Sequence, residues 1–364
     1  MSNLSKILRT LLAAIGILVF SSGCSGSIIW PDKISTENIE TVSETPEGIW
    51  AIKQPAPASR MELTKDNILL FTSHRGHVYL VNPFSGEQIG KKWQPLFFSI
   101  TAHVLNLSED VLFIASQKKN QVIAHNIVQG KTLWKKKITD IQGEMVSYQD
   151  KVYLSRRDGT IIALDKQNGN IAMSVQLTKP IGKGLYQWHD QLLVTTLGGD
   201  LTILSPDLKK IKTHALELCS DPVITLTDGF VIIVNCDGQI VLLDQNGSIS
   251  YPANKTLDTV YSPPQIIDQK LIIAFASGKV MAMDLTSGES IWEFNDGDGL
   301  VNLPIQIKAT QVIIPYTRGT IISLDLTTGL AQWRYKLKHP IRHIKLTSAG
   351  LIVMDSKKSL SLIR

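Results

Sequence analysis

A repeat of about forty residues runs through most of the chain and constrains its fold more than any other feature. Most units have a glycine, an apolar run ending on a polar residue, a second glycine and often a tryptophan, as in SGKVMAMDLTSGESIW at 277–292. The first position of the successive units is occupied by Gly76, Asn120, Gly159, Gly199, Gly238, Gly278, Gly319 and Lys358. So many coincidences at one period indicate a repeat architecture.

Each unit is expected to contain four short strands. In the unit that ends at Phe294, these are segments 264–268, 270–275, 279–284 and 290–294, with turns at Gly278 and Gly288 between them. No unit has helical periodicity. A period near forty residues with four strands per unit is typical of a β-propeller. The sequence therefore predicts an all-β fold, an eight-bladed β-propeller of four-stranded antiparallel blades, over residues 47–364.

The last unit supplies three strands and no outer fourth one. Near the other end of the chain, Gly48 to Ile52 read GIWAI, a strand pattern with no inner strands before it. This N-terminal strand is expected to complete the last blade, which would close the ring and remove an unpaired sheet edge.

The repeated residues have structural explanations. The glycines fall at hairpin turns, where a positive φ favours glycine or asparagine, and the aspartates can accept hydrogen bonds from the amides of the next turn. Five of the seven tryptophans lie in or near outer strands: Trp50, Trp93, Trp134, Trp292 and Trp333. We expect their rings to pack against the neighbouring blade, with the indole NH on a backbone acceptor.

The N-terminal residues 1–23 are predicted to be a signal peptide. Lys6 and Arg9 precede an apolar run from Leu11 to Phe20, which is shorter than the roughly 20 residues that span a bilayer. SSGC at 21–24 resembles the lipobox of bacterial lipoproteins, although Ser21 stands where leucine is usual. The resemblance implies lipidation at Cys24 and, because Ser25 is not aspartate, sorting to the outer membrane. The alternative is ordinary cleavage that leaves a free thiol.

Residues 24–46 are polar and acidic and are expected to form a lipidated, flexible tether to the membrane. The whole sequence has 37 Lys and Arg and 32 Asp and Glu residues. Removal of residues 1–23 takes away Lys6 and Arg9 and leaves 35 against 32, a balance of +3. This near-neutral value argues against a nucleic-acid-binding protein.

Two of the three cysteines form a candidate disulfide. Cys219 and Cys236 lie at equal distances from an expected hairpin turn at Thr227 and Asp228. They should therefore face each other across two antiparallel strands, where a bridge is geometrically feasible in an oxidising compartment. Two buried thiols are the alternative.

The segments DGTIIALDKQNG (158–169), SGKVMAMDLTSGESIW (277–292) and RGTIISLDLTTGLAQW (318–333) resemble the PQQ-like propeller repeats. The resemblance covers nearly all of residues 47–364. Within this superfamily, an exported lipoprotein with eight blades and a closing strand resembles the BamB family, the scaffold lipoproteins of the machinery that folds β-barrels into the outer membrane. This implies a non-catalytic protein on the periplasmic face of the outer membrane, with a BamA-like barrel-forming subunit as partner and with no cofactor, metal or small-molecule substrate.

In that family, the surface that meets the barrel-forming subunit lies on loops leading into two consecutive middle blades. The corresponding loops here are 176–184 and 216–221. They offer Leu177, Lys179, Lys183, Glu217 and Asp221 as partner-binding residues. Ordinary solvated connections between blades are the alternative interpretation.

Two other functions remain open from the sequence. PQQ-dependent dehydrogenases carry the same repeats, but they resemble longer propellers with a calcium site, a catalytic aspartate and, in many members, an adjacent cysteine pair. Here eight blades take up residues 47–364, which leaves no insertion to roof a cofactor, and no two cysteines are adjacent. The chain is therefore predicted not to be an enzyme. The third candidate is an interaction propeller of another envelope complex.

Overall fold

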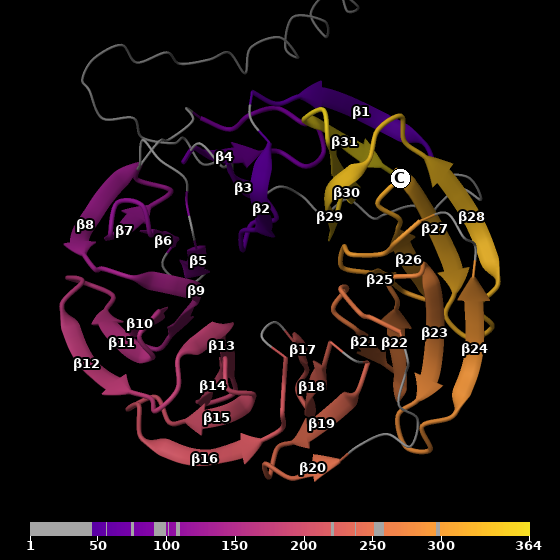
Figure 1. The fold of residues 1–364 in the computed structure, drawn as a ribbon. Coiled ribbons are helices and arrows are strands. Elements are labelled where there is room, and N and C mark those ends of the chain that lie inside the picture. Colours follow the sequence, from indigo (N-terminus) through magenta and orange to yellow (C-terminus); the bar gives the residue numbers. More distant parts are fainter. Residues whose placement is uncertain are drawn as a thin grey trace, which may run out of the picture.

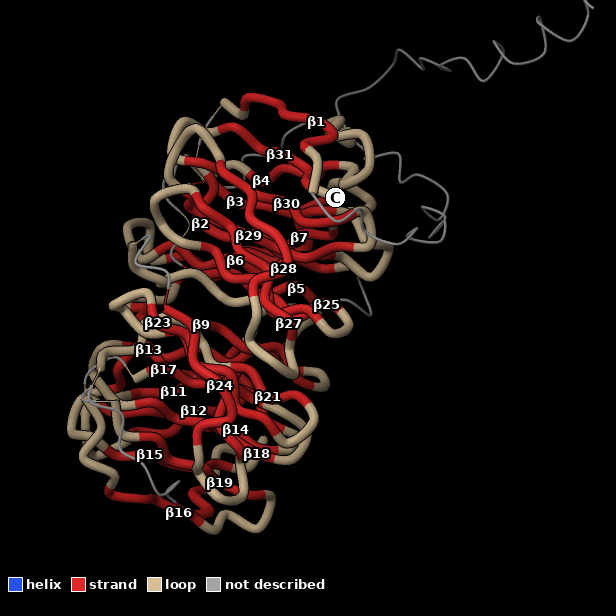
Figure 2. The backbone as a smooth tube through the Cα atoms, turned by 90° about the vertical axis from the view of Figure 1, so that its right-hand side faces the viewer, coloured by secondary structure: helices blue, strands red, loops and turns tan. Residues whose placement is uncertain are grey.

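The structure is a computed structural model that describes residues 46–55, 57–73, 76–90, 100, 102–106, 110–219, 222–236, 238–250, 258–295 and 299–364, with the backbone alone at 102–106 and 183. Within these ranges all regular secondary structure is β. Figure 1 shows eight separate sheets standing in a ring, each with its first strand innermost and its last strand at the rim. Figure 2 shows the same body from the side, built of strands with connecting loops between them. The predicted all-β, eight-bladed propeller is confirmed.

The blades follow one another along the chain. Blade 1 contains β2 (Ala58–Leu63), β3 (Leu69–Ser73) and β4 (Val78–Val81), and blade 2 contains β5 (Ala102–Asn106), β6 (Val111–Ser116), β7 (Gln121–Asn126) and β8 (Lys131–Lys137). Blade 3 contains β9 (Ile141–Tyr148), β10 (Lys151–Arg156), β11 (Thr160–Asp165) and β12 (Ile171–Gln176), and blade 4 contains β13 (Ile181–Trp188), β14 (Gln191–Thr196), β15 (Asp200–Leu204) and β16 (Lys210–Ala215).

The second half repeats this order. Blade 5 contains β17 (Val223–Leu226), β18 (Phe230–Val234), β19 (Ile240–Asp244) and β20 (Ile249–Ser250), and blade 6 contains β21 (Gln265–Ile267), β22 (Lys270–Ala274), β23 (Lys279–Asp284) and β24 (Ser290–Asn295). Blade 7 contains β25 (Gln306–Lys308), β26 (Gln311–Pro315), β27 (Thr320–Asp325) and β28 (Ala331–Lys336), and blade 8 contains β29 (Ile341–Thr347), β30 (Gly350–Asp355), β31 (Ser359–Ile363) and β1 (Gly48–Lys53).

Blade 1 has three described strands, in the order β2-β3-β4. A single bridge between Val81 and Gln88 continues the sheet beyond β4. The expected outer-strand tryptophan of this blade, Trp93, falls in segment 91–99, which lies outside the described residues.

The ring is closed by the two ends of the chain, as predicted. β1 pairs with β31 in an antiparallel ladder that includes Trp50 opposite Leu362 and Lys53 opposite Ser359. Glu47 and Arg364 extend it, because the amide of each donates to the carbonyl of the other, at 2.7 and 3.0 Å. Figure 1 shows β1 beside β31 at the rim of blade 8.

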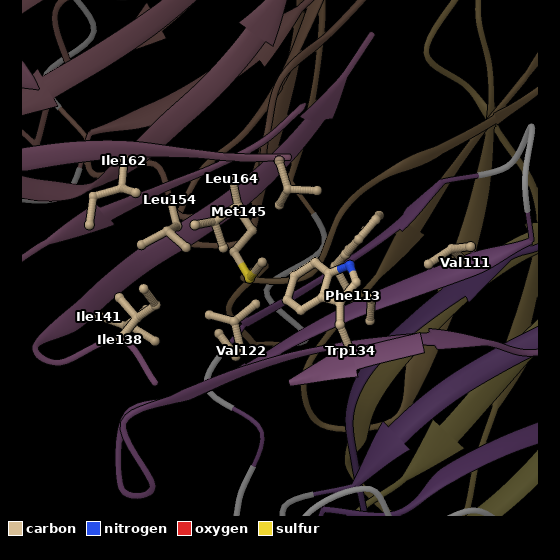
Figure 3. Close-up of a cluster of buried hydrophobic side chains, with 13 residues drawn as sticks. Val111, Phe113, Val122, Trp134, Ile138, Ile141, Met145, Leu154, Ile162 and Leu164 are labelled. Carbon is tan, nitrogen blue, oxygen red and sulfur yellow. The ribbon is translucent and has the colours of Figure 1, made fainter. Parts of the chain in front are cut away.

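The core of the propeller lies between blades. Eight clusters of buried hydrophobic side chains are present in the described part of the chain, one at each junction of neighbouring blades. In Figure 3, Phe113 and Trp134 of blade 2 meet Met145, Leu154 and Leu164 of blade 3. Burial of this apolar area holds adjacent blades face to face, which explains why the central strands of each blade are mostly apolar.

The repeated turn residues do what the sequence predicts. Gly169 and Gly329 have φ of 71° and 72°, and Asn120, in a glycine position, has φ of 49°. At Asp284, one carboxylate oxygen accepts hydrogen bonds from the amides of Thr286 and Ser287, at 2.9 and 2.8 Å. These bonds lower the pKa of Asp284 below its ordinary value.

Three outer-strand tryptophans each join their blade to the next. Trp134 Nε1 of blade 2 donates to the Lys166 carbonyl of blade 3 at 2.7 Å, and its ring lies against Gly169. The same arrangement recurs for Trp50 with Phe84, at 2.9 Å, and for Trp292 with Leu326, at 3.0 Å.

Trp333 in blade 7 departs from this pattern. Its side chain is buried, but its Nε1 has no acceptor among the described residues. The expected backbone acceptor is therefore wrong at this position. Its neighbour, blade 8, is completed by β1 from the other end of the chain, so no turn joins its third and fourth strands to offer a carbonyl.

Candidate partner-binding surface

The loops of the propeller lie on two faces because every blade is an antiparallel meander. The turns between second and third strands and the connections from one blade to the next share one face, which we call the connection face. The turns between first and second and between third and fourth strands lie on the opposite face. Of the two loops predicted to bind a partner, 176–184 is wrong in extent, because Gln176 ends β12 and Ile181 begins β13, so that only residues 177–180 connect the strands. This connection and the described part of the other loop, residues 216–219, lie on the connection face.

The first loop leaves β12 and leads into blade 4. The Leu177 amide donates to the Gly159 carbonyl at 3.0 Å, which ties the start of the loop to the second turn of blade 3. Lys179 Nζ donates to the Gly198 carbonyl at 3.2 Å and forms an ion pair with Asp200 at 2.9 Å. The loop is therefore held to the second turns of two consecutive blades.

The second loop leaves β16 and is also seated on the second turn of blade 4. The amides of Leu216 and Leu218 both donate to the Gly199 carbonyl, at 3.3 and 3.1 Å. Leu216 and Leu218 are buried, whereas Glu217 between them is exposed. A Cβ atom at Gly199 would lie 2.9 Å from the Leu218 nitrogen, so only glycine lets this loop approach so closely.

The turn between β14 and β15, residues 197–199, brings the two predicted loops together. Lys179 contacts it from one side and the backbone of Glu217 covers it from the other. At its tip Leu197 is 51 % exposed, and the Leu197 amide donates to the Pro180 carbonyl at 2.9 Å. The result is an apolar side chain flanked by a lysine and a glutamate on an ordered surface.

Leu197 is the residue that the sequence analysis missed. It stands two residues before the first repeat glycine, where other units carry polar or small residues such as Arg157, Ala276 and Thr317. A large apolar residue at a position that the repeat keeps polar or small is the signal that could have found it.

Two of the predicted partner-binding residues receive no side-chain description. Lys183 belongs to β13, but only its backbone is described, and Asp221 lies outside the described residues. Cys24, the predicted lipidation site, also lies outside them.

Cys219 and Cys236 form a disulfide in the structure, with Cα atoms 5.8 Å apart. Their expected place across two paired strands is wrong. β17 and β18 pair with Val223 opposite Val234 and turn over Thr227–Phe230, so both cysteines lie beyond the end of the ladder. The bridge instead joins the second loop to the second turn of blade 5.

Asn235 supports the same junction. Its Oδ1 accepts the Cys219 amide at 2.7 Å, and its Nδ2 donates to the Glu217 carbonyl at 3.4 Å. The second loop is thus fixed to blade 4 through Gly199 and to blade 5 through Cys236 and Asn235. These contacts hold the backbone of Glu217 in a fixed position on the surface.

Neither a metal centre nor a spanning helix was found in the described ranges. No group of three or more His, Cys, Asp or Glu side chains there could hold a metal ion. No helix in those ranges is long and apolar enough to cross a membrane.

Comparisons with solved structures show likeness in fold. The chain is similar to BamB from Moraxella catarrhalis, with 16 % identity and a TM-score of 0.68 over 88 % of this chain and 100 % of that one. It is similar to the computationally designed Ika8 protein, with 13 % identity and a TM-score of 0.68 over 85 % and 96 % of the two chains. It is also similar to Saccharomyces cerevisiae Sqt1, with 10 % identity and a TM-score of 0.70 over 88 % and 99 %.

Comparison with curated protein sequences gives no significant match. The sequence profile of the family described as outer membrane protein assembly factor BamB matches residues 74–209 and 189–356. Together the two matches span residues 74–356, which is most of the chain and nearly all of the propeller. By this match, and in agreement with its eight-bladed fold, the chain belongs to the BamB family of outer membrane protein assembly factors.

Proposed function

We propose that the chain is a non-catalytic scaffold of the machinery that assembles β-barrels in the outer membrane, and that it binds the periplasmic domains of a BamA-like subunit. Family membership supports the process, because the matching family is one of outer membrane protein assembly factors. The fold alone would not, since propellers serve unrelated functions.

The proposal includes the attachment of the protein to the membrane. Residues 1–23 are removed as a signal peptide, Cys24 is acylated, and residues 24–46 tether the propeller of residues 47–364 to the periplasmic face of the outer membrane. The lipobox-like SSGC at 21–24 supports the anchor. Two or more acyl chains hold a protein stably at a membrane surface without a spanning helix.

The partner-binding surface consists of Leu177, Lys179, Lys183, Leu197, Glu217 and Asp221. One observation supports this location: both predicted loops make hydrogen bonds to the turn at 197–199. Loops that are already ordered lose little conformational entropy on binding. An exposed leucine flanked by opposite charges suits an interface with an apolar centre and a polar rim.

The test is an affinity pull-down of the full-length lipoprotein from chemically crosslinked envelopes. Recovery of the BamA-like subunit is expected. Its clean absence would contradict the proposal, and recovery of a different envelope complex in its place would support the alternative of a propeller that serves another assembly.

The dehydrogenase alternative has a separate test. Adding PQQ and calcium to the purified protein is expected to change neither its absorption spectrum nor its melting temperature. A quinone spectrum on the protein together with a thermal shift would contradict the scaffold assignment.

A further inference from the structure

Cationic side chains gather on the connection face over blade 8. Three segments meet there: residues 53–55, 337–342 and 356–358. The Gln54 amide donates to the Lys358 carbonyl at 2.8 Å, which joins the end of β1 to the second turn of the blade. The Ser356 amide donates to the Pro340 carbonyl at 2.8 Å, which joins that turn to the connection from blade 7. These bonds make the three segments one continuous, ordered surface.

Four exposed cations lie on this surface, which we call the basic surface: Lys53, Lys338, Arg342 and Lys357. None of these four side chains forms an ion pair or a hydrogen bond within the described part of the chain. The three segments contain no acidic residue, and Asp355, which precedes the turn, is buried. Asp355 Oδ1 accepts the amides of Lys357 and Ser359, at 2.8 and 2.9 Å. Like charges gathered on one surface repel one another, so binding an anion there is favourable.

The corresponding positions over blades 3 and 4 carry ion pairs instead. The connections LTKPI (177–181) and LKHPI (337–341) occupy the same place in two repeats. Lys179 of the first pairs with Asp200 at 2.9 Å, but Ser359 stands in the place of Asp200 in blade 8.

The second turns differ in the same way. In blade 3, Asp158 stands just before the repeat glycine and pairs with Arg156 at 3.3 Å. Lys357 occupies the position of Asp158 in blade 8. The repeat thus allows charge pairing at these positions, and blade 8 has a hydroxyl or a cation where the carboxylates would stand.

Carboxylates of a protein suit this surface. Lysine and arginine side chains bind carboxylates through charge-assisted hydrogen bonds, and an acidic segment offers several carboxylates along one chain. An anionic lipid surface has the same sign of charge. However, β1 begins on the opposite face, where the chain leads towards the predicted anchor at Cys24. A tether from that face favours an orientation in which the basic surface points away from the membrane, so the choice of a protein over lipid rests on the proposed lipid anchor.

We propose that the basic surface binds an acidic segment of a protein partner and is a second contact region, separate from the loops of blades 3 to 5. Figure 1 shows blade 8 across the ring from blade 4. Both surfaces lie on the connection face but share no residue, so binding at one leaves the other open.

Fluorescence polarisation with a labelled octaglutamate peptide tests the basic surface on the full mature chain in non-ionic detergent. Lys338→Glu with Lys357→Glu should weaken binding by about tenfold or more, because two attractions become repulsions. Lys338→Arg with Lys357→Arg keeps both charges and should bind as the wild type does. Lys135→Glu with Lys137→Glu is the matched control, since both lysines are exposed on β8 at the rim of blade 2. This control should keep most of the wild-type affinity.

Three results with the peptide would overturn the proposal. They are the absence of binding by the wild type, unchanged binding by Lys338→Glu with Lys357→Glu, and equal weakening by the control pair, which would show attraction to net charge alone. Unchanged melting temperatures would show that the variants are folded, as expected for exposed side chains.

The lipid alternative is measured with phosphatidylcholine vesicles that contain phosphatidylglycerol. The full mature chain with Cys24→Ser is used, because it cannot be acylated at residue 24. Vesicle binding that depends on Lys338 and Lys357, without peptide binding, would assign the surface to lipid and overturn the proposal. All these measurements use the isolated chain without a BamA-like subunit, so their failure would leave the scaffold proposal standing.

Discussion

The second glycine of the repeat and the tryptophan of the preceding blade form one structural unit. A Cβ atom at Gly169 would lie 2.5 Å from Cε3 of Trp134, and one at Gly329 would lie 2.6 Å from Cδ2 of Trp292. The glycine thus meets two requirements: its backbone has a positive φ, and it has no Cβ atom, so the indole ring can pack directly against it. Trp134 then buries its ring in the junction between blades 2 and 3.

Alanine substitutions can separate the two requirements. Gly169 and Gly247 share a φ of 71°, but a Cβ atom at Gly247 would meet nothing closer than Lys212 Nζ at 3.8 Å. Both substitutions should cost about 1 kcal/mol for the backbone conformation. Gly169→Ala should cost about 1–3 kcal/mol more, because the Trp134 ring must move. Urea unfolding of the two variants measures the difference, and equal losses would contradict the packing argument.

His125 makes the propeller sensitive to acid. Burial in β7 lowers its pKa from the ordinary 6.5 to about 3. Between these two pH values the unfolded chain binds a proton that the folded chain does not, so this contribution to stability is lost as pH falls through the window. His125→Gln should flatten the loss of melting temperature between pH 6.5 and 3. The same slope in His125→Gln as in the wild type would contradict this role of His125.

At the scale of elements, β1 is short but closes the ring. It is one strand of six residues, yet it covers the edge of β31 and brings Trp50 onto Phe84 and Gly86 of blade 1. Closure of the ring therefore depends on a strand that no hairpin connects to its own blade.

Deleting residues 47–54 should lower the melting temperature markedly and expose β31 as an unpaired edge. A deletion of the same length at residues 27–34 controls for the shortened N-terminal segment and should leave the melting temperature unchanged. Thermal unfolding followed by circular dichroism is the measurement. An unchanged melting temperature in the first variant would contradict closure by β1.

The Cys219–Cys236 disulfide constrains the connection that leaves β16 against blade 5. The bridge closes a sequence separation of 17 residues and should contribute about 3 kcal/mol. Reduction, or the double substitution Cys219→Ser and Cys236→Ser, should lower stability and speed amide exchange at 216–219. Adding reductant to the double variant should have no further effect. Mass spectrometry of the exported protein should find the two peptides linked, and free thiols would contradict the bridge.

At the scale of the whole molecule, the proposed partner-binding surface and the start of β1 lie on opposite faces. β1 begins at Gly48, opposite Ile363 at the end of β31. That end belongs to the face where third and fourth strands join in the other blades. Leu197 and both predicted loops lie on the connection face. A protein tethered through its N-terminal segment would therefore present its partner-binding surface away from the point where the tether leaves the ring.

A pair of leucines tests which face binds. Leu197→Asp, on the connection face, should weaken binding to the periplasmic domains of a BamA-like subunit by about tenfold or more, because a charge would enter the centre of the interface. Leu330→Asp is the control. Leu330 is 69 % exposed and lies in the turn between β27 and β28, on the opposite face. Equal binding by both variants would contradict the proposed surface.

Local regularity made most of the fold predictable. The propeller, its eight blades, the strand that closes it and the roles of the turn glycines and aspartates all follow from a pattern that recurs along the chain. The secondary structure of a single segment is ambiguous from its sequence, but the same pattern in several units identifies the strands and turns. The loops that bring the candidate site together do not repeat, and the resemblance to a family indicated where to look but not which side chains meet.

The sequence by itself determined the architecture, because apolar periodicity and turn chemistry act between residues close together in the chain. Only the tertiary structure decided what happens between blades. It showed that Lys179 and Glu217 reach one turn, that Leu197 stands between them and that the disulfide lies beyond its strands. It also showed that Trp333 Nε1 has no acceptor among the residues that the structure describes. These facts depend on how side chains of neighbouring blades are placed around the ring, and that placement leaves no local mark on the sequence.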